Sequence, residues 1–337
     1  MNDETLRDIL GKLVMGARLT TEEASAAMAT IMEGEATAAQ IGGLLTALAL
    51  RGETEEEVVG FAREMRERAV PVRSHDAVDT CGTGGDGAGT FNISTLASLV
   101  VAACGVPVAK HGNRAASGKC GSADVLEALG VDVAPGPERV QRCLDEVGWA
   151  FLFAPSFHAA TRHAVGPRRE LGVRTAFNLL GPLTNPARPV AQLVGVPRRD
   201  LVGFVARCLA QLGTPRAWVV HGSGLDEVSL CGPTSVAALR DGEIREMEIS
   251  PEDAGLARCE LEALAGGDAS ACAAIARRVL DGEDGAPGDA VVLNAAATLC
   301  AAGVVADLEE GASRAREALE SGRARELLAR VIEVSGS

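Results

Sequence analysis

The chain has 337 residues and a formal net charge of −14 at pH 7, and 47% of its residues are hydrophobic. This balance is ordinary for a globular protein and gives enough apolar surface for one large domain or two modest ones. The acidic excess and the absence of tyrosine disfavour a nucleic-acid binder, which needs a basic face and often aromatic side chains on which bases stack.

The cysteines and the apolar runs favour a cytoplasmic protein with no membrane partner. Nine cysteines are scattered without a C-x-x-C pair, so they indicate neither a disulfide scaffold nor a zinc site. The acidic start MNDETLRDIL is not typical of a signal or transit peptide. The longest apolar run, 96–109, contains Gly105 and Pro107 and is too short to cross a bilayer.

Residues 1–70 show helical periodicity throughout and no strand-like alternation. The segment TTEEASAAMATIMEG carries a cap signal at Thr21 followed by acidic residues in the first turn. The segment TAAQIGGLLTALALRG is apolar nearly all round, which predicts a buried helix, with a second subunit as one candidate cover. Pro71 then ends the helical block.

From Ala77 the pattern changes to short strand-like runs that alternate with helical ones. The expected strands are AVDTC, VPVAKH, VDVA, WAFLFA, AQLVGV, RAWVVHG and EIREMEIS, and the tail from about Pro251 returns to helix. Such alternation predicts a mainly parallel sheet covered by helices. The expected fold class is therefore α/β, with a small all-helical domain at 1–70 and a larger domain at 71–337.

A glycine-rich stretch, DTCGTGGDGAGTFNIST, follows the first expected strand and contains G-x-G-x-x-G at Gly82, Gly84 and Gly87. A dinucleotide site needs an acidic residue at the end of the second strand, but that strand ends in Lys110. A nucleoside-triphosphate loop needs lysine where Thr90 stands. The remaining interpretation is a phosphate site. Backbone N–H groups at the start of a helix would bind the phosphate together with the hydroxyls and the amide of TFNIST.

Three further polar clusters predict contacts with a phosphate, a metal ion or a carboxylate. KHGNRAASGKCGSADVLEALG brings cations and hydroxyls to the same sheet edge, where α/β proteins bind ligands. In HGSGLDEVSL, Asp226 and Glu227 are suited to hold magnesium together with substrate phosphates. GPRRELGVRT supplies arginines suited to a carboxylate. Each cluster alone is also consistent with a solvated turn, but together they predict transfer chemistry on a polyphosphorylated metabolite.

Four motifs then carry a family resemblance. GTGGDGAGTFNIST, KHGNRAASGKCGSADVLEALG, RRELGVRTAFNLLGPLTNP and HGSGLDEVSLCGPTSVAAL closely resemble those of the anthranilate phosphoribosyltransferases, in register along essentially the whole chain. The resemblance implies a homodimer whose interface lies in the helical domain, with a contribution from about 165–190, and ligands at the hinge between domains. It also implies Mg2+-dependent transfer of phosphoribose from 5-phosphoribosyl 1-diphosphate to the amine of anthranilate.

The resemblance also assigns site residues, none of them as a general acid or base. Contacts to the diphosphate substrate are implied for Gly82, Gly85, Asp86, Thr90, Asn92, Ile93, Ser94, Thr95, Lys110, His111, Gly112, Asn113, Arg114, Ala115, Ala116, Ser117, Gly118 and Ser122. Contacts to anthranilate are implied for Gly82, His111, Asn113 and Arg168, and ligation of Mg2+ for Ser94, Asp226 and Glu227.

Two departures from the family pattern and two rival hypotheses remain. Gly118 stands where the family usually has a second serine, and FHAA at 157–160 replaces the usual His-Pro. A pyrimidine nucleoside phosphorylase-like enzyme is the nearest rival, but that chemistry has no diphosphate that would require FNIST and GLDE. A non-catalytic relative that binds nucleic acid is the other, and the net charge of −14 argues against it.

Overall fold

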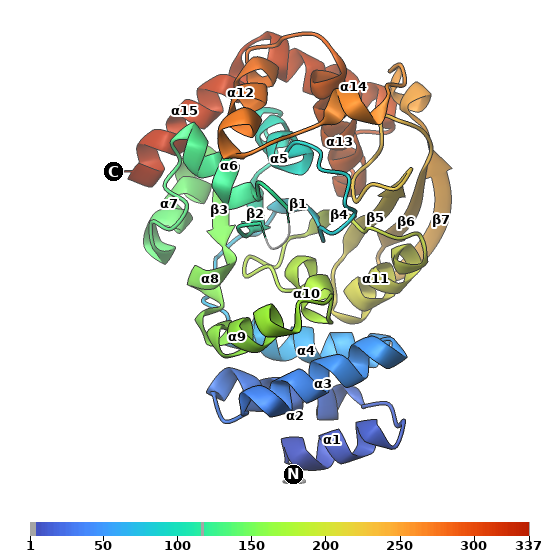
Figure 1. Cartoon of the computed structure of the whole chain (residues 1–337). Helices are drawn as coiled ribbons and strands as arrows, with labels where there is room; N and C mark the ends of the chain where they lie inside the picture. The colour runs from blue at the N-terminus through green and yellow to red at the C-terminus, as the bar shows by residue number, and fades with distance from the viewer. Residues whose placement is uncertain (1–4, 116–117, 337) are drawn as a thin grey trace.

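Four helices, each opened by a threonine, form the N-terminal part of the fold (Figure 1). They are α1 (Leu6–Val14), α2 (Thr21–Glu33), α3 (Ala38–Arg51) and α4 (Glu55–Arg68). In each capping box the threonine side chain accepts from a backbone N–H three residues on, and that residue's side chain accepts in return. The cap expected at Thr21 is wrong by one residue, because Thr20 pairs with Glu23 at the required spacing.

The structure is a computed structural model that describes residues 5–115 and 118–336. Its centre is a seven-stranded sheet in the order β3-β2-β1-β4-β5-β6-β7. The strands are β1 (Val78–Gly82), β2 (Val108–Gly112), β3 (Trp149–Phe153), β4 (Ala191–Gly195), β5 (Arg216–Gly222), β6 (Thr234–Arg240) and β7 (Glu243–Ile249). The first five are parallel, and β6 and β7 extend the edge antiparallel. The predicted α/β class with a mainly parallel sheet is confirmed.

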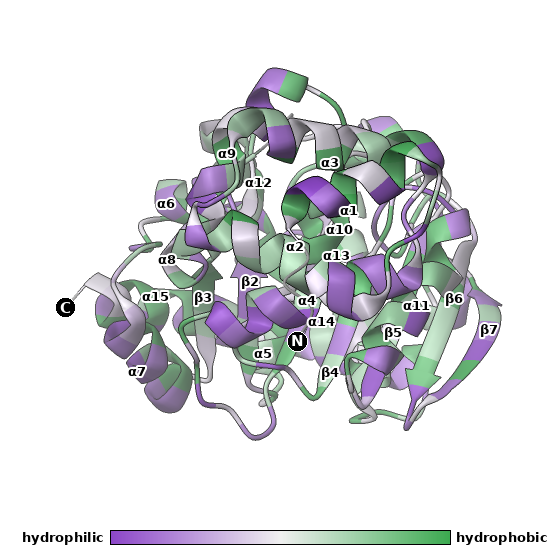
Figure 2. Cartoon of the chain, turned by 90° about the horizontal axis from the view of Figure 1, so that it is seen from below, coloured by the Kyte–Doolittle hydropathy of each residue, from purple (hydrophilic) through white to green (hydrophobic). Residues whose placement is uncertain are grey.

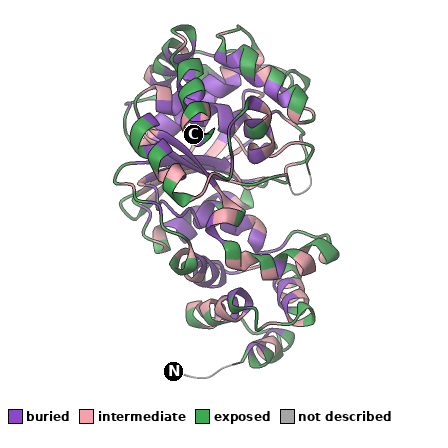
Figure 3. Cartoon of the chain, turned by 90° about the vertical axis from the view of Figure 1, so that its left-hand side faces the viewer, coloured by how far each residue is buried: buried purple, intermediate pink, exposed green. Residues whose placement is uncertain are grey.

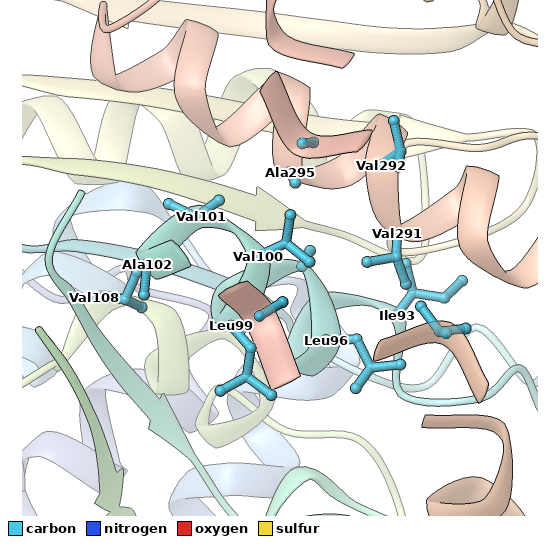
Figure 4. Packing of buried hydrophobic residues seen from close by; sticks show 14 of the residues in the cluster. Ile93, Leu96, Leu99, Val100, Val101, Ala102, Val108, Val291, Val292 and Ala295 are labelled. Atoms are coloured by element: carbon cyan, nitrogen blue, oxygen red, sulfur yellow. The ribbon is translucent and has the colours of Figure 1, made fainter. Parts of the chain in front are cut away.

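Helices cover both faces of the sheet. Beyond α4 they are α5 (Ile93–Ala103), α6 (Ser122–Leu129), α7 (Pro137–Val147), α8 (Ala154–Phe157), α9 (Arg162–Leu171), α10 (Phe177–Leu183), α11 (Asp200–Gln211), α12 (Ala269–Leu280), α13 (Ala286–Ala302), α14 (Leu308–Glu320) and α15 (Arg323–Gly336). On one face α5 packs against α13, and Figure 4 shows Ile93, Leu96 and Val100 beside Val291 and Val292. On the other face α11 lies against β5 and β6. No helix in the described ranges is long and apolar enough to cross a bilayer.

Two sequence-based strand assignments differ from the structure. VDVA, 131–134, is a loop whose Val131 and Val133 are buried in the core, so their alternation reflects burial without strand pairing. β6 was not expected, because its short apolar run follows directly on the polar loop and Pro233. Its pairing with both β5 and β7 supplies the strand character that local sequence does not show.

One apolar core joins the N-terminal helices to a later part of the chain. The cluster runs from Leu6 to Met65, continues through Ala164 and residues 176–183, and reaches the strands and α11. Within it α9 packs against α2 and α3, and α10 packs against α4. Figure 3 shows these buried residues inside, with exposed residues along the outer helix faces. The first four helices therefore share their core with residues that lie about a hundred positions later in the sequence.

Candidate active site

Three loops meet at the carboxyl edge of the sheet, where β1 lies between β2 and β4. They are the glycine loop after β1 (83–92), the second loop after β2 (of which 113–115 and 118–121 are described) and the acidic loop after β5 (223–229). After β1 the chain forms β2 beside one edge of β1 and later forms β4 beside its other edge. The connections that leave β1 in these two directions diverge at its carboxyl end. This is the position at which open α/β sheets bind ligands.

Glycines at the strand ends make room for the acidic loop. A Cβ on Gly82 would lie 2.2 Å from Oδ2 of Asp226, and one on Gly195 would lie 1.6 Å from the Asp226 carbonyl oxygen. At Gly222 a Cβ would lie 2.5 Å from the Glu227 carbonyl oxygen. Sequence reasoning found Gly82 but missed Gly195 and Gly222, whose only signal is a glycine at or next to the end of an expected strand.

Asp226 and Glu227 form the acidic centre of the site, with Asp86 beside them. Oδ2 of Asp226 accepts a hydrogen bond of 2.6 Å from the Gly84 N–H. Burial, followed by the Asp86 charge, raises the pKa of Asp226, and burial and the Asp226 charge raise the pKa of Glu227. Burial makes these carboxyl groups hard to ionise, and a bound cation would offset that cost because it stabilises their charged form.

This donor set fits Mg2+ when a substrate supplies the remaining oxygens. In residues 5–115 and 118–336, no three His, Cys, Asp or Glu side chains are arranged to hold a metal ion. Mg2+ usually takes one or two protein carboxylates together with phosphate oxygens and waters. Asp226 and Glu227 meet that requirement.

Lys110 and Ser94 connect the sheet to the acidic loop. The Lys110 side chain is buried, and its Nζ donates 2.5 Å to the Thr80 carbonyl and 3.5 Å to Ser94 Oγ. The Ser94 N–H in turn donates 3.2 Å to Glu227 Oε1, at the positive end of the α5 dipole. Ile93 and Thr95 are both buried, at 1% exposed, and their contacts with a ligand stay predictions. The predicted ligand Ser94 therefore lies directly beside Glu227.

The glycine loop and the second loop are tied together at their ends. Asn92 makes no side-chain cap on α5 but donates 3.2 Å from Nδ2 to the Cys120 carbonyl. The Asn113 N–H donates 3.2 Å to Ser122 Oγ, and a Cβ on Gly112 would lie 2.4 Å from that same oxygen. Thr90 forms an isolated bridge with Ala265. The contact between Asn92 and Cys120 therefore joins the end of the glycine loop to the end of the second loop.

The Arg114 side chain is engaged elsewhere. Its Nη1 donates 2.9 Å to Asp124 and 2.7 Å to Glu127, and these hydrogen bonds raise the pKa of the guanidinium. The Ala115 N–H likewise donates 3.1 Å to Asp124. Phosphate contacts by these two residues stay predictions, while Ala116 and Ser117 lie outside the described residues. Gly118 is exposed, with open space where a Cβ would stand.

Arg168 lies in the last turn of α9 with its guanidinium 4.7 Å from the centre of the Phe177 ring. Stacking of this kind fixes the plane of the guanidinium. Partial burial lowers the pKa of Arg168, and its side chain forms no ion pair within the described residues. An arginine that is held in place but lacks an acidic partner is suited to receive a ligand carboxylate.

His111 is buried against His158, with ring centres 5.2 Å apart. Its Nδ1 lies 2.9 Å from the Gly181 carbonyl, which can only accept, so Nδ1 carries the proton. Burial, and next the neighbouring His158, lower the pKa of His111 to about 3. The ring is therefore neutral at pH 7, and its predicted contact with anthranilate does not involve an imidazolium.

A pH-dependent stability follows from this depressed pKa. Below pH 6.5 the unfolded chain takes up a proton at His111 that the folded chain refuses, so acid favours unfolding. We expect this group to lower the free energy of unfolding by about 2 kcal/mol between pH 7.5 and pH 5. Urea unfolding at both values should show a smaller loss in His111→Asn, which keeps a donor near Gly181. Equal losses in both proteins would contradict the assignment.

The comparisons with known proteins agree with this geometry. Residues 7–69 match a glycosyl transferase family helical bundle domain, and residues 74–325 match the α/β domain of that family. An anthranilate phosphoribosyltransferase of Moorella thermoacetica is 56% identical over 322 residues, covering 95% of each chain.

Solved structures extend the likeness to the whole fold. The anthranilate phosphoribosyltransferase of Thermus thermophilus is 49% identical, with a TM-score of 0.92 over 98% of this chain and 100% of that one. The Saccharomyces cerevisiae enzyme in complex with PRPP and Mg is 27% identical, with a TM-score of 0.91 over 99% of each chain. The chain belongs to the glycosyl transferase family of these two domains and, within it, to the anthranilate phosphoribosyltransferases.

Proposed function

We propose that this chain transfers the phosphoribosyl group from 5-phosphoribosyl 1-diphosphate to the amine of anthranilate. The products are N-(5-phosphoribosyl)anthranilate and diphosphate, as in tryptophan biosynthesis. The observation that carries the proposal is the acidic loop, whose Asp226 and Glu227 meet the glycine loop and Ser94 at one edge. Relatives that cover the chain from end to end carry the same activity in their names. They favour the transferase over the phosphorylase and over the nucleic-acid-binding relative.

The chemistry places different demands on the two substrates. The aromatic amine of anthranilate is neutral at pH 7, so its attack needs no general base. The difficult event is departure of diphosphate from a sugar carbon that gains oxocarbenium character. The protein's task is therefore to orient the amine through Arg168 and to receive the departing charge at the glycine loop and Lys110.

Mg2+ completes the proposal, with Asp226, Glu227 and Ser94 as its protein ligands. When bound there, the ion neutralises charge on the diphosphate and thereby helps it to leave. The raised pKa values of both carboxylates agree with a site built for a cation. Lys110 lies near Glu227, and its side chain partly offsets the rise in the pKa of that carboxyl.

The test is to follow the loss of anthranilate fluorescence with and without the diphosphate substrate and with and without Mg2+. We expect loss only when both substrates and the metal are present. A folded protein that consumes no anthranilate under these conditions would contradict the proposal, and other aromatic amines would then be screened as acceptors.

Restoring the missing hydroxyl should improve binding of the diphosphate substrate. At Gly118 a Cβ meets open space, so Gly118→Ser fits without displacing a neighbour. One added hydrogen bond is worth about 1 kcal/mol, so the KM for 5-phosphoribosyl 1-diphosphate should fall by about 5-fold. Initial rates on Gly118→Ser and on a Gly118→Ala control separate the hydroxyl from the backbone change. An equal KM in both variants would show that the hydroxyl contributes nothing.

A homodimer built through the helical domain is also proposed. Four apolar residues, in α1, at its C-cap, in α3 and in α9, are more than half exposed: Val14 80%, Met15 86%, Leu50 84% and Val165 55%. Figure 2 views the molecule from this end and shows hydrophobic segments along α1 and α3. Covering such side chains stabilises an interface. Sedimentation of the wild type and of a Met15→Glu, Leu50→Glu variant tests this, because a wild-type monomer would refute it.

A cytoplasmic location stays part of the proposal. All nine cysteines are free, as expected where thiols are kept reduced.

A further inference from the structure

Arg174 connects the α9 segment to the glycine loop. It follows α9 on the surface, and its Nη1 donates 3.0 Å to the Gly84 carbonyl oxygen. The guanidinium also lies directly over Gly85, where a Cβ would stand 1.3 Å from Nη1. Gly85 has a φ of +84°, so a larger residue would be strained by its backbone and by this contact. The loop is therefore shaped to receive Arg174.

This contact sets the direction of a backbone donor. No peptide bond in the described chain is cis, so the Gly84 carbonyl and the Gly85 N–H lie in one peptide plane and point in opposite directions. With Arg174 on the carbonyl and Asp226 on the Gly84 N–H, both peptides that flank Gly84 are held. The Gly85 N–H thus has a fixed direction, as a phosphate-binding donor requires.

The same short segment carries the arginine that receives anthranilate in the proposed function. Arg168 and Arg174 lie on either side of Gly172, which ends α9 in the left-handed conformation. The Gly172 N–H closes the helix by donating 3.2 Å to the Arg168 carbonyl. Arg174 is followed at once by Thr175, whose N–H donates 2.9 Å to Asn178 at the start of α10. Only a short stretch of chain, closed by the Gly172 hydrogen bond, separates Arg168 from Arg174, so a displacement of the glycine loop can reach Arg168 through it.

We propose that Arg174 is a positioning residue that couples the two substrate sites. By fastening the segment of Arg168 to Gly84 and Gly85, it makes binding of one substrate favour binding of the other. This inference rests on the proposed function, because it needs a diphosphate substrate on the glycine loop and a carboxylate on Arg168. In this role Arg174 acts through Gly84 and Gly85.

Initial rates measured over a grid of both substrate concentrations test the coupling. They give the dissociation constant of each substrate from the free enzyme and from the enzyme that already holds the other. We expect the wild type to bind each substrate about 5-fold or more tightly when the other is present. In Arg174→Ala this ratio should fall close to one, while Arg174→Lys, which still donates to the carbonyl, should keep much of it.

Arg162→Ala is the matched control, since Arg162 is an exposed arginine at the start of the same helix. It should keep the wild-type ratio, and melting temperatures should show all variants folded. Gly85→Ala is a second route, because its methyl group must displace the guanidinium and should also abolish the coupling. An unchanged ratio in Arg174→Ala, or no coupling in an active wild type, would overturn this inference alone. A wild type that turns over neither substrate would instead overturn the proposed function.

Discussion

Replacing Asp226 with Asn and Glu227 with Gln should lower turnover by about 100-fold or more, or roughly 3 kcal/mol of transition-state stabilisation. Both substitutions keep shape and remove charge, so the hydrogen bonds from Gly84 and Ser94 can persist. Loss of the charge weakens the binding of Mg2+, and the departing diphosphate is then less well stabilised. Steady-state rates at saturating Mg2+ check the prediction, and unchanged turnover would refute the metal role.

The same variant should be no less stable than the wild type, which separates chemistry from folding. In the wild type both carboxyl pKa values are raised by folding. The folded wild type therefore holds protons that the unfolded chain has released. The stability contributed by these groups is present below about pH 4 and is lost as pH rises toward 8. Without metal at pH 8 the variant should therefore melt at or above the wild-type temperature. The exposed pair Glu283 and Asp284, changed to Gln and Asn, is the control that should leave turnover unchanged.

Replacing Arg168 with Ala should raise the KM for anthranilate by about 10- to 100-fold, because hydrogen bonds to a charged group contribute roughly 1.5–3 kcal/mol. The stacking on Phe177 holds the guanidinium ready, so the loss includes an orientation that a flexible cation cannot restore. Arg168→Lys should therefore recover only part of the binding. The KM for the diphosphate substrate should change much less.

Initial rates for each substrate, with the other saturating, check this prediction. Arg162→Ala removes an exposed arginine of α9 and should leave both KM values at their wild-type level. A selective rise in the KM of the diphosphate substrate would contradict the assignment of Arg168 to anthranilate.

Local sequence predicts much of this fold because its signals are periodic. The four N-terminal helices carry both apolar stripes and capping boxes, so even the error at Thr21 is a single residue. The failures are at VDVA, where alternating valines are buried in a loop, and at β6, which is a strand because two neighbours pair with it. Burial and pairing are tertiary properties that a short window of sequence does not contain.

The candidate site also has parts that local sequence predicts and parts that it does not. The motifs around Gly82, Lys110 and Asp226 could be placed at one sheet edge, because each follows a strand whose carboxyl end lies there. Sequence could not show that Arg114 is engaged by Asp124, since that contact depends on how the second loop folds back on α6. Nor could it show that Gly195 must be small, because the atom it accommodates is more than thirty residues away on the acidic loop.

The core shared between the first helices and α9–α10 has a consequence for how the chain folds while the ribosome makes it. A ribosome that adds roughly 5–20 residues per second needs on the order of 10 s to pass from Met65 to Ala164. During that interval the apolar faces of α1 to α4 have left the ribosome without the segment that finally covers them. The nascent chain is therefore open to chaperones, and to premature association with other nascent chains, until α9 and α10 arrive.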